Sequence, residues 1–222
     1  MISTACEKTG FEEIAAEYAE WQGGMLVSDS NSGSDDNATA DSKPTTQGTV
    51  IEDGIVDLGL SVKWAAKNLS KSTSDHFATY CINFGSEFSW YASNDYLPPT
   101  EIGGSDLDNA TVLLGEGWQT PSVEQVKELQ ERCLIQQTTY RGTSGVVITG
   151  PSGNAIFLPA ARNQGDINVE YYNSCYWTSS YNLSKGEGYY MSVPYSASGT
   201  FSCSKSASTT TTLLIRPVYV GI

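Results

Sequence analysis

The feature that most constrains the fold is a stretch near the N-terminus with almost no core-forming side chains. Residues 28–50 read SDSNSGSDDNATADSKPTTQGTV, mostly Ser, Asp, Asn, Thr and Gly. Such a segment buries too little apolar surface to offset the entropy lost on ordering, so it predicts a flexible linker. The sequence therefore divides into an N-terminal segment (1–27), an acidic linker (28–53) and one domain (54–222), which is long enough for a substantial core.

The N-terminal segment contains one helical pattern. Apolar residues recur there at helical spacing with acids opposite, at Phe11, Ile14, Ala15, Tyr18 and Trp21. One short amphipathic helix does not fold alone, so it must dock on the domain, pack on a partner or fray. The preceding run ISTAC, which ends at Cys6, is similar to the small-residue stretch before a lipid-modified cysteine. It suggests a lipid anchor at Cys6; the alternative is an ordinary thiol in a frayed terminus.

The charge balance excludes two classes of partner. The 222 residues include 25 acidic and 12 basic side chains, for a net charge of −13. A chain this acidic, with no Lys/Arg cluster, neutralises phosphates poorly, so we expect neither nucleic acid nor anionic membrane surfaces as partners. No apolar run approaches the ~20 residues of a spanning helix.

Side chains that carry metal or catalytic chemistry are sparse. The five cysteines contain no CxxC spacing, and one histidine cannot complete a Cys/His zinc set, so we expect no metal and no cofactor. Besides Cys6, the four cysteines 81, 133, 175 and 203 allow two disulfides or four buried thiols. His76 is interpreted as an ordinary loop histidine, and residues 106–109 (DLDN) as a solvated loop rather than an ion site.

Residues 120–133 form the clearest helix signal in the chain. Thr120 or Ser122 can cap it, Pro121 suits its first turn, and Glu124 lies at capping-box distance. Short β-type runs punctuated by turns follow, and a strand or strand pair is expected earlier, at 56–64. One clear helix followed by many short strands predicts an α+β domain with a twisted antiparallel sheet.

Five blocks resemble a known family. They are VDLGLSVKWA (56–65), GWQTPSVE (117–124), TGPSGNAIFLPAA (149–161), YWTSS (176–180) and IRPV (215–218). Their order and spacing resemble the Fibrobacter succinogenes major paralogous domain family, relatives of the DUF1566 proteins. The resemblance implies a C-type lectin-like fold over nearly all of 54–220, with the following scaffold residues: Trp118, Pro121, Phe157, Leu158, Trp177 and Arg216. Gln119 replaces the usual arginine, and Arg162 replaces a common glycine.

Residues 163–212 have a different composition from the rest of the domain. Seven of the 13 tyrosines lie between Tyr171 and Tyr195, among many Ser and Thr residues. Tyrosine with Ser, Gly and Asn is typical of adaptable binding surfaces, because tyrosine supplies contact area at low entropic loss. The stretch resembles the variable region of lectin-fold proteins diversified by retroelements. The alternative is a Ser/Thr-rich β surface whose role is solubility.

These observations predict a non-catalytic, adhesin-like protein displayed at the cell surface as an outer-membrane lipoprotein or pilus-associated protein. Its ligand would be a protein or glycan on another cell or host surface. We expect one exposed face formed by Asn163, Asp166, Asn168, Glu170, Tyr171, Tyr172, Asn173, Tyr181, Asn182, Tyr190, Ser192, Tyr195, Ser204 and Ser206. Two alternatives remain: an enzyme of the formylglycine-generating type, with Cys175 and Cys203 as its thiols, and a structural pilus or surface subunit.

Overall fold

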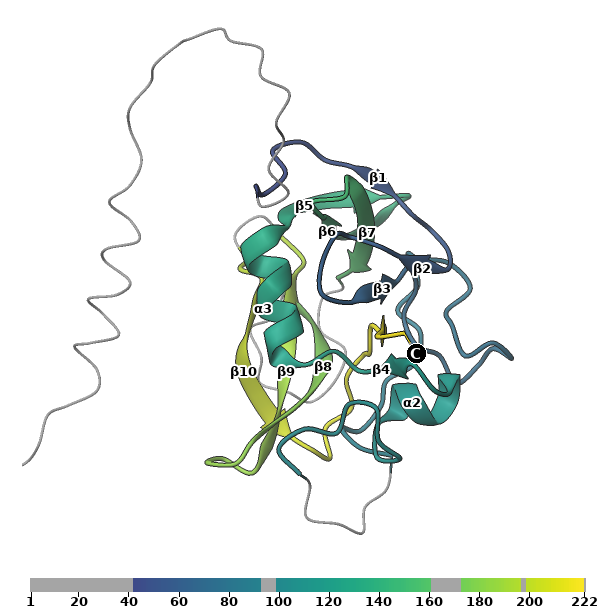
Figure 1. The fold of residues 1–222 in the computed structure, drawn as a ribbon, viewed down its shortest axis with the longest axis vertical. Helices are drawn as coiled ribbons and strands as arrows, with labels where there is room; N and C mark the ends of the chain where they lie inside the picture. The colour runs from purple at the N-terminus through teal and green to yellow at the C-terminus, as the bar shows by residue number, and fades with distance from the viewer. Residues whose placement is uncertain (1–41, 93–98, 161–172, 197–198, 222) are drawn as a thin grey trace, which may run out of the picture. The chain divides into compact units, whose positions relative to one another are not determined.

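The computed structural model describes residues 42–92, 99–160, 173–196 and 199–221. The chain divides into two units, 1–38 and Thr39–Ile222, and all the described residues belong to the second. The expected N-terminal helix and the lipid anchor at Cys6 lie outside the described residues. In the described part the fold is mixed α+β, with two helices and three sheets (Figure 1).

The first sheet has the order β1-β7-β6-β5. Its strands are β1 (Thr49–Val50), β5 (Leu134–Tyr140), β6 (Thr143–Thr149) and β7 (Asn154–Pro159). Strand β1 runs parallel to β7, and the other pairs are antiparallel. Residues 42–53 were expected to be linker, yet β1 lies within them and Val50 packs against this sheet. The domain therefore begins before residue 54.

The second sheet joins the two ends of the domain. It has the order β2-β3-β11-β4, with strands β2 (Ile55–Val56), β3 (Lys63–Ala65), β4 (Trp118–Gln119) and β11 (Val218–Tyr219). All its pairs are antiparallel. These strands have two or three residues each, and the pairs that β11 makes with β3 and β4 join segments that are distant in the chain. Closing the sheet with β11 places the C-terminal segment between β3 and β4.

The third sheet carries most of the Tyr- and Ser-rich region. Its order is β10-β9-β8, all antiparallel, with β8 (Asn173–Asn182), β9 (Glu187–Pro194) and β10 (Ser202–Ser208). Irregular register interrupts both pairs, between Ser202 and Lys205 and between Trp177 and Tyr181. The strands expected from the sequence at 174–180, 188–193 and 200–204 lie within or overlap these elements.

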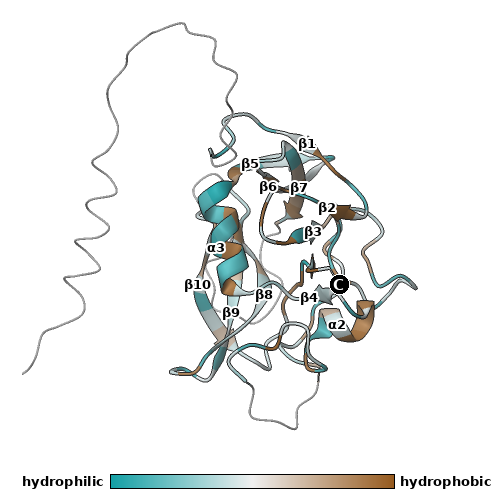
Figure 2. Cartoon of the chain, in the orientation of Figure 1, coloured by the Kyte–Doolittle hydropathy of each residue, from teal (hydrophilic) through white to brown (hydrophobic). Residues whose placement is uncertain are grey.

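Helix α3 (Val123–Arg132) covers one side of the third sheet (Figure 1). Ser122 caps it, and its Oγ accepts a hydrogen bond from Gln125 N while the Gln125 side chain accepts one from Ser122 N. The capping box thus uses Gln125 and not Glu124, which instead pairs with Lys127 at 2.8 Å. Figure 2 shows hydrophilic and hydrophobic positions interleaved along α3, as expected for a helix with one buried side.

Helix α2 (Asn109–Leu114) was not expected from the sequence. Its N-cap is Asp108, a residue interpreted from the sequence as part of a solvated loop. That interpretation is wrong, because Asp108 is fully buried and its carboxylate accepts hydrogen bonds from Thr120 N and Oγ1, Ala110 N, Thr111 Oγ1 and Gly104 N. Burial raises the pKa of Asp108, and the hydrogen bonds oppose this rise. Through its hydrogen bonds with Thr120, the carboxylate connects the start of α2 to the segment that leads into α3.

Two large clusters form the core. The first is formed by α3 together with residues of all three sheets, and includes Trp64, Leu129, Ile148, Tyr176 and Met191. The second lies on the other side of the third sheet and includes Phe88, Trp90, Trp177, Tyr190 and Ile215. The third sheet is therefore covered on both sides over much of its length.

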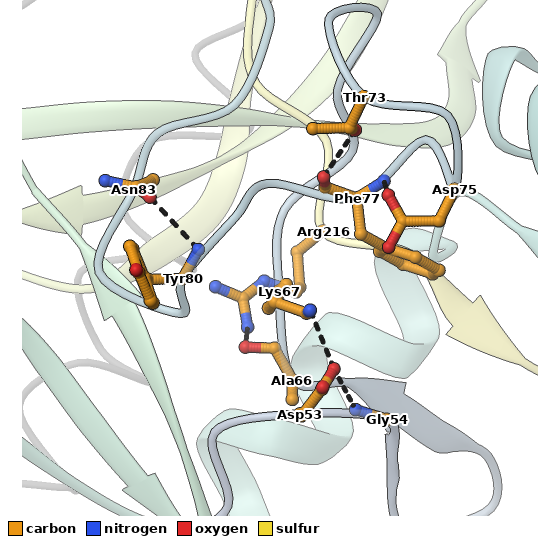
Figure 3. Close-up of polar contacts among 10 residues, drawn as sticks. All are labelled: Asp53, Gly54, Ala66, Lys67, Thr73, Asp75, Phe77, Tyr80, Asn83 and Arg216. Atoms are coloured by element: carbon orange, nitrogen blue, oxygen red, sulfur yellow. Dashed lines mark hydrogen bonds and ion pairs between the residues drawn. The ribbon is translucent and has the colours of Figure 1, made fainter.

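Arg216 connects distant segments inside the core (Figure 3). Its fully buried guanidinium donates to Asn68 Oδ1 at 2.7 Å, to the carbonyls of Ala65 and Ala66, and to the carbonyl of Phe157 at 2.8 Å. Burial lowers its pKa to about 10, so it stays charged at neutral pH. Local bonds fix the loop beside it, among them Thr73 Oγ1 to the carbonyl of Phe77 at 2.6 Å.

The residues expected as scaffold are mostly buried. Pro121, Phe157, Leu158, Trp177 and Arg216 have little or no exposed surface. Trp118 is half-buried, with its ring 5.3 Å from that of Phe77 and 5.2 Å from that of Tyr219. Core packing thus accounts for five of the six, and Trp118 lies at the edge of the packed interior.

Candidate ligand-binding face

Strand β9 has one side that faces α3. Because side chains alternate along a strand, Glu187, Tyr189, Met191 and Val193 point to the same side. Met191 and Val193 pack with Leu129 of α3 in the first core cluster. Tyr189 and Glu187 lie further along the same side and are only half-buried. Figure 1 shows why: the three strands continue beyond the end of α3.

The uncovered part of this side forms a continuous polar surface on two strands. The register places Ser206 beside Tyr189 and Ser208 beside Glu187. Ser204, two residues before Ser206 on β10, is exposed, as is Ser208. We call this surface the open face; it consists of Glu187, Tyr189, Ser204, Ser206 and Ser208.

Hydrogen bonds connect the residues of the open face to one another and to the neighbouring strand β8. Ser206 Oγ donates to Glu187 Oε2 at 2.6 Å, and the hydroxyl of Thr178 on β8 donates to the carbonyl of Tyr189 at 2.9 Å. At the border with α3, Ser180 Oγ accepts from Val123 N at 3.0 Å and donates to Glu101 Oε2 at 2.6 Å. The face therefore presents hydroxyls, one carboxylate and one phenol ring from ordered strands.

Two predicted site residues lie elsewhere than expected. Tyr190 is 3% exposed and Ser192 is fully buried, so the expectation that they belong to an exposed face is wrong. Alternation along β9 sends both away from Met191, to the side of the sheet that the second core cluster covers. The Tyr190 ring packs edge-on against Trp177, with ring centroids 6.4 Å apart.

The remaining predicted residues do not form one surface in the described part of the chain. Ser204 and Ser206 belong to the open face. Tyr181 is half-buried on the covered side, its ring 5.2 Å from that of Trp90. Tyr195 directly follows β9, at the end of the strand opposite to Glu187, and is 36% exposed. The side chain of Gln137 donates a hydrogen bond to the carbonyl of Tyr195. Asn182 lies beside Glu187 in the register, and its side chain shapes the adjoining turn.

Several predicted positions lie outside what the structure describes. Asn173 is described only as the first residue of β8, opposite Pro194. The others outside the described residues are Asn163, Asp166, Asn168, Glu170, Tyr171 and Tyr172.

Tyr189, Glu187 and Ser208 are face residues that sequence reasoning missed. Tyr189 shares the side of Met191 and Val193, which lie in the core, so alternation alone would place Tyr189 in the core as well. A length comparison could have corrected this. A ten-residue helix spans about 15 Å, whereas a ten-residue strand spans about 33 Å, so α3 can cover only about half of β8 and its neighbours.

The thiols of the described residues are poor nucleophiles. Cys81, Cys133, Cys175 and Cys203 are all free, so the sequence alternative of four thiols applies rather than two disulfides. Burial raises the pKa of Cys133 and of Cys175 to about 12 and also raises that of Cys203. At neutral pH these groups are protonated, and only a thiolate attacks efficiently.

The described residues contain neither a candidate metal site nor a helix that could span a membrane. Their His, Cys, Asp and Glu side chains form no group of three or more that could hold a metal ion. None of their helices has the length and apolarity needed to cross a membrane.

Comparison with known proteins gives no relative. No family model, curated protein or solved structure matches the chain.

Proposed function

We propose that this protein is a non-catalytic, surface-displayed binding protein that contacts a protein or glycan ligand through the open face. The observation that carries the proposal is the uncovered end of the third sheet, where Tyr189, Glu187 and three serines lie together on ordered strands. Tyrosine and serine in such a setting combine a large rigid contact with adaptable hydrogen bonding. The protonated thiols favour binding over chemistry of the formylglycine-generating type.

The proposal also covers the fold family and the display of the protein. A C-type lectin-like fold related to the Fibrobacter succinogenes major paralogous domain family is supported by the five sequence blocks and by the burial of most scaffold residues. Anchoring through Cys6 and retroelement diversification of 163–212 belong to the same proposal. A reverse-transcriptase gene and a template repeat beside the coding sequence would support diversification.

The first experiment compares a tyrosine variant of the open face, Tyr189→Ala, with a matched tyrosine variant elsewhere, Tyr80→Ala. Full-length protein is applied to arrays of defined glycans and of purified ectodomains, beside Tyr189→Ala and Glu187→Gln. Interface tyrosines commonly contribute about 2 kcal/mol, so we expect Tyr189→Ala to weaken binding about 30-fold. Tyr80, which is 61% exposed and belongs to none of the three sheets, supplies the control Tyr80→Ala.

The melting temperature separates lost binding from lost folding. Glu187→Gln keeps the size of the side chain and its contact with Ser206, so the sheet should stay folded. The substitution removes the negative charge of the open face, so binding should weaken. The proposal is wrong if the wild-type protein binds no feature on either array. Equal losses for Tyr189→Ala and Tyr80→Ala would also count against it.

A further inference from the structure

The turn between β8 and β9 is fixed by one residue. The backbone N–H groups of Lys185 and Gly186 donate to the carbonyl of Asn182 at 3.2 and 2.9 Å. The Asn182 side-chain oxygen accepts from Ser184 Oγ at 2.7 Å and from Lys185 N at 3.3 Å. Gly186 has φ +71°, a left-handed conformation that glycine adopts without a Cβ clash. The turn is therefore preorganised.

This turn presents an apolar side chain to solvent. Leu183 is 68% exposed, more than any other large apolar side chain in the described ranges. It belongs to the hairpin that extends past the end of α3 (Figure 1). A single exposed leucine on a flat surface needs no explanation. Here, however, the leucine is held on a fixed turn next to the open face.

The open face and the turn together have the layout of a protein-binding surface. Stable interfaces combine a few central apolar or aromatic anchors with a surrounding polar rim. Leu183 and Tyr189 can serve as anchors, and Lys185, Glu187 and Ser208 supply polar groups around them. Since Asn182 orders the turn, little conformational entropy is lost when Leu183 becomes buried.

We propose that Leu183 is an apolar anchor of the binding surface and that the ligand is a folded protein with an apolar pocket. This inference rests on the proposed function and narrows its ligand to one class. A leucine side chain forms no hydrogen bonds with sugar hydroxyls, and it gains affinity only when an apolar environment removes it from water. Folded proteins offer such pockets, whereas glycans present hydroxyl-rich surfaces. Asn182 is a positioning residue in this scheme.

The test measures binding of the full chain to the same glycan and ectodomain arrays. For the ectodomain that wild-type protein binds most tightly, we expect Leu183→Ala to raise Kd at least tenfold. Leu183→Met keeps the apolar volume and should raise Kd less than threefold. Val112 on α2 is 54% exposed, so Val112→Ala is the matched control and should leave Kd unchanged. Melting temperatures of all variants should match the wild type.

The outcomes distinguish this inference from the proposed function. If wild-type protein binds only glycans, or if Leu183→Ala changes Kd less than twofold while Tyr189→Ala weakens binding, the leucine anchor is overturned and the open face stands. If no feature is bound, or if neither variant has an effect, both are overturned. An intermediate loss for Asn182→Ala, with hairpin amides exchanging faster with solvent, would support its positioning role.

Discussion

Arg216 is the residue whose environment most constrains its identity. It brings a full positive charge into the core, where its described partners are three backbone carbonyls and the side-chain oxygen of Asn68. Asn68 is itself buried and donates to the carbonyl of Phe84 at 3.1 Å. The planar, five-donor guanidinium fits this fixed set of oxygens, and a lysine ammonium cannot reach all of them.

We predict that Arg216→Lys strongly destabilises the protein. The variant leaves buried oxygens without donors and retains a charge with fewer hydrogen bonds, which costs about 3 kcal/mol or more. For a domain of this size that corresponds to a fall in melting temperature of at least about 6 °C. Thermal unfolding followed by circular dichroism measures it.

Arg132→Lys is the matched control for this prediction. Arg132 lies at the end of α3, is half-buried and pairs with Glu128 at 3.2 Å. A lysine keeps the positive charge beside Glu128 at this partly exposed end of the helix, so this variant should melt much closer to the wild type than Arg216→Lys does. If both substitutions shift the melting temperature equally, Arg216 does not have the structural role assigned to it.

At the scale of elements, α3 depends on its N-terminal cap. Ser122→Ala removes the acceptor of Gln125 N and one half of the capping box. We predict a loss of about 1 kcal/mol, or about 2–4 °C in melting temperature. Ser208→Ala, at an exposed position of β10, should change it by less. A shift no larger for Ser122→Ala than for Ser208→Ala would contradict the importance of the cap.

The elements that sequence predicted well are those with their own periodicity. Residues 120–133 carry a capping signal and a buried stripe, and the helix begins and ends within that range. Strands of two residues, such as β4 and β11, have no internal pattern, because each depends on a partner about 100 residues away. Helix α2 was not predicted for a similar reason. Its N-cap, Asp108, accepts hydrogen bonds from Thr120, which lies outside the helix and later in the chain.

The candidate binding face was predictable only in part. Alternation along β9 correctly separated Tyr190 and Ser192 from Met191, but it indicates which side chains share a side and not what covers that side. Trp90, far earlier in the sequence, packs so closely on Gly188 that an added Cβ would lie 2.4 Å from its ring. That cover buries Tyr190, and the limited length of α3 leaves Tyr189 accessible.

At the scale of the whole molecule, the domain boundary depends on contacts that composition does not reveal. Residues 42–53 are polar on average, yet Gly48 N donates to Thr149 Oγ1 and Ile51 N donates to the carbonyl of Ala155 at 2.8 Å. Lys43 also donates to the carbonyl of Gln130 near the end of α3. A few backbone hydrogen bonds and two apolar side chains, Val50 and Ile51, are enough to add this segment to the domain.

The fragment 54–222 should accordingly be less stable than the fragment 42–222. Without β1, the carbonyl of Ala155 loses its donor and the apolar side chains beneath Val50 gain exposure to water. Each unsatisfied buried group costs about 1–3 kcal/mol, and exposing a valine site adds a comparable amount. We therefore expect 54–222 to melt at least about 4 °C below 42–222. Amides of β7 should exchange faster with solvent in the shorter fragment, while those of β8 should not. If the two fragments melt together, β1 is dispensable and the polar composition of 42–53 describes a linker after all.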